Sequence, residues 1–256
     1  MPPVQDTPKP DPACRLSRRG LLGGSVVLGA VPLAAAAETI SGRGPPWTAN
    51  KADSPPTVDP AHRYGYFNPA EAAFVEAASA RMIPNDNLGP SALEAGVPIF
   101  IDRQLAGDFG AATRMYMQGP WAKGEKTQGY QSRFSPAQMY RAAIPAIDNA
   151  ASKTGNAPFA RLKGEDQDGF LTQLAAGQVD LGQVDGVAFF TLLLQNVMEG
   201  FFSDPLYGGN RDMVCWKLIG FPGARYDQTE FVSKYGQPYP LPPVGIVGRP
   251  GWNGKG

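Results

Sequence analysis

Apolar residues recur at the spacing of an α-helix in about five segments of the chain, and the alternating pattern of strands is scarce. The first segment opens with Asn68, Pro69 and Glu71, which suit the N-cap, the first helical position and the third. Small and apolar residues then continue to Met82. The pattern predicts a helix over 69–82 and indicates an all-α fold.

The second predicted helix begins at a capping box formed by Ser91 and Glu94 and ends at Gly107. Because proline lacks a backbone N–H and its ring crowds the preceding turn, Pro98 predicts a kink within this helix. The apolar positions at helical spacing are Leu93, Val97, Phe100, Ile101 and Leu105.

Further helices are predicted in the second half of the chain. The pair Ser135-Pro136 opens a helix that bends at Pro145 and ends at Gly155. A shorter helix is predicted over 166–176. The last, over 186–201, is apolar at nearly every position, which predicts burial almost all round.

Together these segments predict a compact all-α bundle of about five helices with long irregular loops and extended Pro/Gly-rich arms. The helical domain is assigned to residues 64–235. A proline-rich linker is predicted over 38–63, and a Pro/Gly-rich tail without core elements over 236–256. Within the domain, residues 107–134 indicate a long surface loop with aromatic anchors.

Residues 1–37 have the features of an export signal. An apolar run follows paired arginines, and small residues suited to a signal peptidase end it. The order of residues is similar to the twin-arginine consensus, and a glycine-rich, mildly hydrophobic core is typical of that route, which carries proteins already folded. The residues of the predicted motif are Ser17, Arg18, Arg19, Leu21 and Leu22.

Two other interpretations of this segment stay open. It can be retained as a membrane anchor, or the arginine pair can precede a buried helix by chance. Pro32 and several glycines in the apolar run disfavour a stable spanning helix.

Charge and residue counts exclude several classes of function. The 23 basic and 23 acidic residues balance and form no basic block, so nothing predicts binding of nucleic acid. The one histidine, His62, lies in the proline-rich stretch, which excludes a Ser-His-Asp triad or a His-ligated metal within the domain. Cys14 and Cys215 are too far apart in the sequence to form a Cys-x-x-Cys-His motif for haem attachment, and two cysteines are too few for a Cys-rich metal cluster. We therefore expect no catalytic, cofactor-binding or metal-binding residue in this chain.

The densest segment is DPLYGGNRDMVCWKLIGFPG, residues 204–223, called the signature segment below. Its glycines permit positive φ and close approach of backbone, and its polar side chains can satisfy buried backbone groups. The segment is predicted to be a self-contained structural unit, a docking surface with aromatic and arginine anchors, or both. The predicted docking residues are Asp204, Pro205, Tyr207, Gly208, Gly209, Asn210, Arg211, Cys215 and Trp216.

With the residues before it, this segment reads EGFFSDPLYGGNRDMVCWKLIGFPG and resembles the signature of the gluconate 2-dehydrogenase subunit 3 family. The strings NPAEAAFVEAASARMIPND and GPSALEAGVPIFIDRQLAG extend the resemblance, in matching order and spacing, over most of residues 66–223. Members of this family are small subunits of bacterial membrane-bound flavin dehydrogenases.

The resemblance implies a complex of three parts. A large FAD-dependent flavoprotein of the glucose-methanol-choline type oxidises a sugar or sugar acid, and a multihaem cytochrome c passes the electrons to membrane quinone. The small subunit accompanies the flavoprotein and carries the export signal for it. FAD and haem c then belong to the partner subunits, and the complex lies in the periplasm at the outer face of the inner membrane. The choice among gluconate, ketogluconate, fructose, glucose and sorbitol is a property of the large subunit.

Cys215 is the one cysteine expected in the mature chain, because Cys14 leaves with the signal. In an oxidising compartment it is either a buried thiol or half of a disulfide to the large subunit. The tail over 236–256 is suited to lie extended along a partner or to be disordered alone.

Two functions of other classes stay open beside the accessory subunit. One is an independent periplasmic enzyme that uses Asp, Glu or Arg side chains of the signature segment. The other is an export chaperone that leaves its client after delivery.

Overall fold

The computed structural model describes residues 64–122, 124–125, 127–225 and 227–246. Within these ranges the chain forms α-helices, short 3-10 turns and isolated β-bridges, and no strands. The prediction of an all-α fold is confirmed. The twin-arginine motif, the linker over 38–63 and the end of the tail lie outside the described residues, so the predicted domain boundaries stay predictions.

Helix α2 (Pro69–Met82) begins where the sequence predicted. The Asn68 side chain accepts hydrogen bonds from the N–H groups of Ala70 and Glu71, each at 3.0 Å, and the Glu71 carboxylate accepts the Asn68 N–H at 3.0 Å. This reciprocal capping satisfies N–H groups that the first helical turn leaves without partners. The inner face of α2 carries Phe74 and Val75, both fully buried.

Helix α3 (Val97–Ala106) begins later than predicted, and the predicted kink at Pro98 was wrong. Ser91 and Glu94 do form their reciprocal hydrogen bonds, at 2.8 and 3.2 Å, but these close a turn and start no helix. Gly96, at φ +79°, then separates the turn from the helix. Pro98 falls in the first helical turn, where its missing N–H and fixed φ are tolerated.

Helices α5 (Pro136–Gly155) and α6 (Gly164–Ala175) follow the predicted order. Ser135 and Gln138 form a capping box at the start of α5, which continues through Pro145. Between them lies the 3-10 turn η2 (Phe159–Arg161), which buries Phe159.

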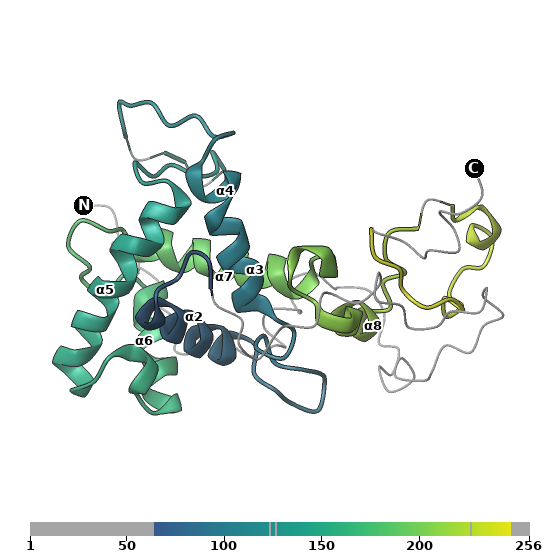
Figure 1. Ribbon diagram of the computed structural model, residues 1–256, viewed down its shortest axis with the longest axis horizontal. Helices are drawn as coiled ribbons and strands as arrows, with labels where there is room; N and C mark the ends of the chain where they lie inside the picture. The colour runs from purple at the N-terminus through teal and green to yellow at the C-terminus, as the bar shows by residue number, and fades with distance from the viewer. Residues whose placement is uncertain (1–63, 123, 126, 226, 247–256) are drawn as a thin grey trace, which may run out of the picture.

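Helix α7 (Gly186–Phe202) is the central element, in contact with α2, α3, α5, α6 and α8 (Figure 1). The aromatic core forms on its inner side, where the Phe189 ring lies 5.3 Å from that of Tyr140 and 6.1 Å from that of Phe74. The prediction of burial almost all round was wrong, because one side of α7 faces solvent. The exposed stripe at four-residue spacing comprises Val187, Thr191, Gln195 and Glu199.

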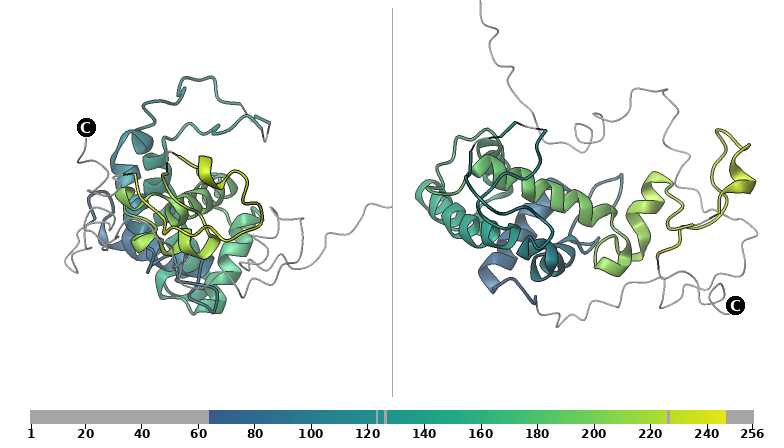
Figure 2. Two further views of the ribbon diagram at one scale, coloured as in Figure 1. Left: turned by 90° about the vertical axis from the view of Figure 1, so that its right-hand side faces the viewer. Right: turned by 90° about the horizontal axis from the view of Figure 1, so that it is seen from above.

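The predicted surface loop contains a short helix, α4 (Asp108–Ala111), and then projects from the body (Figure 2). Tyr130 and Phe134 pack against the core as predicted anchors. Tyr116 is 80% exposed and Trp121 42% exposed, and neither ring packs against the core of the described chain.

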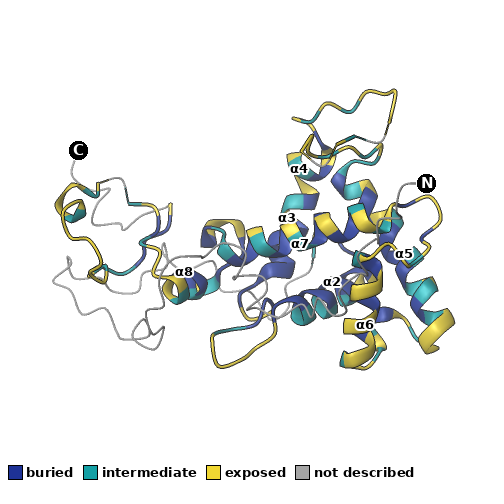
Figure 3. Ribbon diagram, turned by 180° about the vertical axis from the view of Figure 1, so that it is seen from behind, coloured by how far each residue is buried: buried dark blue, intermediate teal, exposed yellow. Residues whose placement is uncertain are grey.

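A short helix, α8 (Val214–Ile219), lies at the end of the body away from α5, and the C-terminal arm of residues 224–243 extends beyond it (Figure 1). Figure 3 shows that buried residues line the inner faces of α2, α3 and α7, whereas most of the arm is exposed. Across the described ranges, no helix is both long enough and apolar enough to span a membrane.

Candidate functional site

The signature segment folds as two 3-10 turns and a helix directly after α7. The turn η3 (Pro205–Tyr207) is followed by Gly208, Gly209 and Asn210, and η4 (Arg211–Met213) then leads into α8. In Figure 1 it runs from the end of α7 through α8, at the end of the body away from α5.

Asp204 opens the segment and binds backbone on two sides. One carboxylate oxygen accepts the N–H of Leu206 at 2.9 Å, and the other accepts the N–H of Ile246 at 2.6 Å. The first bond caps η3, because it satisfies an N–H that a helix start leaves without a partner. The second ties the distant C-terminal part of the chain to the signature segment.

The glycine pair is required by its surroundings. Gly208 has φ +103°, a conformation that side-chain-bearing residues rarely adopt. A Cβ on Gly209 would lie 2.0 Å from the carbonyl oxygen of Gly200, so only glycine allows the turn to press against α7. The two glycines are therefore needed for the backbone conformation of the turn and for its close packing against α7.

Asn210 links the end of α7 to the start of α8. Its side chain is fully buried; the amide nitrogen donates to the carbonyl of Ser203 at 2.9 Å, and the amide oxygen accepts the N–H of Cys215 at 2.9 Å. Asn210 itself adopts a left-handed conformation at φ +43°, which asparagine tolerates better than most residues.

Cys215 and Trp216 lie in the interior of the segment. Cys215 is fully buried, which favours the buried-thiol interpretation over a disulfide to another subunit. The indole N–H of Trp216 donates to the carbonyl of Phe202 at 2.8 Å, and its ring meets that of Phe221 edge-on at 5.1 Å. Both residues thus fix α8 against the end of α7.

The model of the gluconate 2-dehydrogenase subunit 3 family matches residues 69–223, more than half of the chain. The chain belongs to this family. The subunit 3 match confirms the resemblance drawn from the three sequence strings, and it runs from the start of α2 to the end of the signature segment. The family name denotes one subunit of a multi-subunit gluconate 2-dehydrogenase. No match is found among curated proteins or among solved structures.

Most of the docking residues predicted for this subunit 3 chain are turned inward. Arg211 is partly buried and Tyr207 is 44% exposed. The buried ones are Asp204, Pro205, Gly208, Gly209, Asn210, Cys215 and Trp216. Their intramolecular contacts stabilise the fold of the signature segment itself. Their role in docking stays a prediction.

The outer surface of the subunit 3 signature carries apolar side chains that the sequence prediction missed. Leu206 is 47% exposed, Ile219 53% and Phe221 45%. A signal for them was present: each is an apolar residue within three positions of a glycine that ends a turn or a helix, where side chains tend to face solvent. We call these three side chains and Tyr207 the apolar rim; Leu206 and Tyr207 lie on η3, and Ile219 and Phe221 lie at and just after the end of α8.

The described residues of the tail of the subunit 3 chain, 236–246, fold back onto the signature segment without forming a helix or strand. Val244 is fully buried and forms a parallel bridge with Gly223. A Cβ on Gly223 would lie 2.1 Å from the carbonyl oxygen of Val244, so the contact requires glycine. Close to this bridge, the Arg225 side chain donates to the carbonyl of Pro242, which joins the start of the C-terminal arm to its end.

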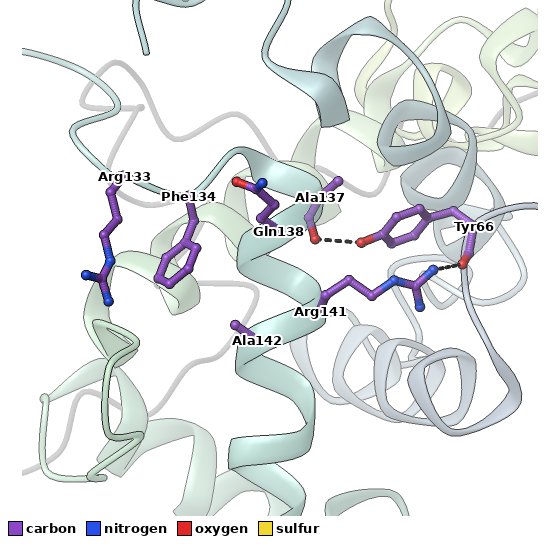
Figure 4. Close-up of a pocket in the computed structure, with 7 residues that line it drawn as sticks. All are labelled: Tyr66, Arg133, Phe134, Ala137, Gln138, Arg141 and Ala142. Carbon is purple, nitrogen blue, oxygen red and sulfur yellow. Dashed lines mark hydrogen bonds between the residues drawn. The ribbon is translucent and has the colours of Figure 1, made fainter. Parts of the chain in front are cut away.

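A pocket of about 610 Å³ lies on the other side of the body, between Tyr66, Phe134 and the first turns of α5 (Figure 4). The Tyr66 hydroxyl donates to the carbonyl of Ala137 at 2.5 Å, and burial raises the Tyr66 pKa to about 12. Arg141 lies 4.1 Å above the Tyr66 ring and donates both to the Tyr66 carbonyl and to the buried Glu71 carboxylate. These contacts hold the segment that precedes α2 against α5. We therefore assign the pocket a structural role.

In the part of the chain that the structure describes, no three or more His, Cys, Asp or Glu side chains are grouped so as to hold a metal ion.

Proposed function

We propose that this chain is the non-catalytic small subunit of a periplasmic, membrane-associated, flavin-dependent complex of the gluconate 2-dehydrogenase type. It is needed for twin-arginine export, folding and stability of the flavoprotein subunit. The observation that carries this proposal is the family match over residues 69–223, which spans the whole helical body.

The export signal supports a role as escort. The motif of Ser17, Arg18, Arg19, Leu21 and Leu22 precedes a chain whose sequence offers no histidine or cysteine site for chemistry. In this proposal the signal serves the flavoprotein as well, because a folded pair crosses the membrane together. FAD and haem c reside in the flavoprotein and in a multihaem cytochrome c, where alcohol oxidation and electron relay take place.

The apolar rim supports a docking role for the signature segment. Its aromatic and aliphatic side chains are exposed, whereas the residues beneath them are fixed by the hydrogen bonds of Asp204, Asn210 and Trp216. A rigid surface binds with a smaller loss of conformational entropy than a flexible one. Aromatic anchors in a pre-formed surface are the usual centres of protein interfaces.

Export is tested by replacing the arginine pair. The variant Arg18→Lys/Arg19→Lys keeps the charge and removes the twin-arginine recognition, so we expect the flavoprotein to stay in the cytoplasm. Arg15→Lys, outside the motif, is the matched control and should leave delivery unchanged. Undiminished delivery by the double variant would overturn the escort role.

The other two functions are tested by purification. A stoichiometric complex of this chain with a flavoprotein, recovered from membranes, excludes a chaperone that leaves after delivery. Turnover of a sugar acid by the processed chain alone would establish an independent enzyme and contradict the proposal.

A further inference from the structure

Two arginines approach the same glycine of the signature segment from different elements. Arg103 lies on α3 and Arg211 on η4. A Cβ on Gly208 would lie 2.9 Å from a terminal nitrogen of Arg103. A Cβ on Gly96 would lie 2.6 Å from the Gly208 carbonyl oxygen and 3.6 Å from a terminal nitrogen of Arg211. The two guanidinium groups therefore flank the backbone around Gly208.

Neither guanidinium meets a carboxylate among the residues that the structure describes. The ion pairs found there join Arg81 to Asp168 and Arg141 to Glu71. The Nε of Arg211 is buried and has no hydrogen-bond acceptor within the described ranges, whereas Arg103 is exposed. Arg103 therefore presents a guanidinium group that a partner can reach.

The carboxylates nearest in the sequence form no ion pair with these two arginines within the described residues. Asp102 accepts three backbone N–H groups, from Gly65, Tyr66 and Phe67, at 2.8 to 2.9 Å. Asp204 holds two backbone N–H groups, as described above. Asp212 is exposed and forms no ion pair within the described chain. Arg103 and Arg211 therefore have no carboxylate partner within the described residues, although acidic and basic residues balance in the whole sequence.

We infer that Arg103 and Arg211 together receive an acidic side chain of the partner flavoprotein, while Leu206 and Tyr207 contact apolar residues beside it. Guanidinium groups suit this role, because they donate in a planar fork that matches a carboxylate. Leu206 and Tyr207 are 47% and 44% exposed and directly precede Gly208, so charge and apolar surface adjoin. This inference rests on the proposed function and adds the chemistry of the contact.

The test measures binding between this chain and the flavoprotein subunit of its complex. Arg103→Met keeps much of the side-chain length and removes the charge, and the Arg103 side chain has no hydrogen bond to lose within the described residues. We expect roughly tenfold weaker binding for Arg103→Met, and a larger loss for Arg103→Met/Arg211→Met, because truncating one partner of a charge pair at an interface raises the dissociation rate. Arg161→Met, an exposed arginine on η2, is the matched control and should bind as the wild type does.

The outcomes separate the two proposals. If the wild-type chain does not bind the flavoprotein, the proposed function fails and the inference fails with it. If the wild type binds and Arg103→Met binds equally well, with the same dependence on salt, only the inference is overturned. A specific confirmation is a charge exchange, in which Arg103→Glu abolishes binding and an acid-to-lysine substitution on the flavoprotein restores it. Arg103→Met alone decides the question should the double variant fail to fold.

Discussion

The side-chain oxygen of Asn210 accepts the backbone N–H of Cys215 at 2.9 Å, and both residues are fully buried. The same side chain donates to the carbonyl of Ser203 at the end of α7. One amide group thus connects the central helix, the glycine turn and α8. The position of the apolar rim depends on this connection, because Leu206 and Ile219 lie on the segments that it joins.

Replacing Asn210 tests that connection. Asn210→Ala removes the acceptor of the Cys215 N–H and the donor to Ser203, and it places alanine in a left-handed conformation. We expect a loss of roughly 2–4 kcal/mol in the free energy of unfolding, measured by urea denaturation. The control Asn149→Ala, at an exposed position of α5, should change that free energy by less than about 0.5 kcal/mol. Equal stability of the two variants would contradict the role of Asn210.

Two glycine-to-alanine substitutions are expected to have opposite effects. At Gly209 the new Cβ would lie 2.0 Å from the backbone oxygen of Gly200, so α7 or the turn must shift, at a cost of roughly 1–3 kcal/mol. At Gly169, within α6, an added Cβ would meet no atom within 4 Å beyond its chain neighbours and the nearby backbone of its own helix, and alanine stabilises a helix by about 0.5–1 kcal/mol relative to glycine. Thermal unfolding followed by circular dichroism should show a lower midpoint for Gly209→Ala and a higher one for Gly169→Ala. An unchanged or higher midpoint for Gly209→Ala would contradict the requirement for glycine at that position.

The Asp204 carboxylate is expected to protect the C-terminal arm from proteolysis. Asp204→Ala removes the acceptor for the Ile246 N–H, so the base of the arm loses one of its closing contacts. We expect trypsin to cleave after Arg225 and Lys234 several-fold faster than in the wild type, because cleavage follows local opening.

The control for this experiment is Asp227→Ala, in which the substituted carboxylate binds only within the arm, to the N–H of Thr229. Its cleavage rate after Lys234 should stay close to that of the wild type. Unchanged proteolysis of Asp204→Ala would contradict a closing role for its carboxylate.

The Tyr66 hydroxyl gives a prediction for alkaline pH. Burial raises its pKa from 10.0 to about 12, Arg141 opposes that rise, and Glu71 adds to it. Since the folded state holds this proton more tightly than the unfolded state, the contribution to stability is complete below pH 10 and is lost as pH rises through 12. The free energy of unfolding of the wild type should therefore fall across this interval.

Tyr66→Phe separates this effect from general alkaline unfolding. The variant should be less stable at neutral pH, because the hydrogen bond to the Ala137 carbonyl is gone. Between pH 10 and 12 it should lose less stability than the wild type. Parallel pH profiles for the two proteins would show that Tyr66 is not the titrating group.

The sequence by itself determined the helical character of the chain and most helix starts. The capping boxes of Asn68 with Glu71 and of Ser135 with Gln138 join residues three positions apart, so their hydrogen bonds are available from local sequence alone. Family membership could likewise be predicted from the sequence, because three segments match the family in order and spacing. The family match over residues 69–223 confirmed this prediction.

Only the tertiary structure decided where local signals compete with long-range packing. The Ser91–Glu94 box closes a turn because Gly96 is held against Gly208, a contact that no local pattern encodes. Val244 is buried because it pairs with Gly223, although its own neighbours are prolines and glycines. Arg103 and Arg211 flank one glycine because α3 and the signature segment lie side by side. Hydrogen bonds between near neighbours are specified by spacing, whereas these contacts depend on which surfaces the whole chain brings together.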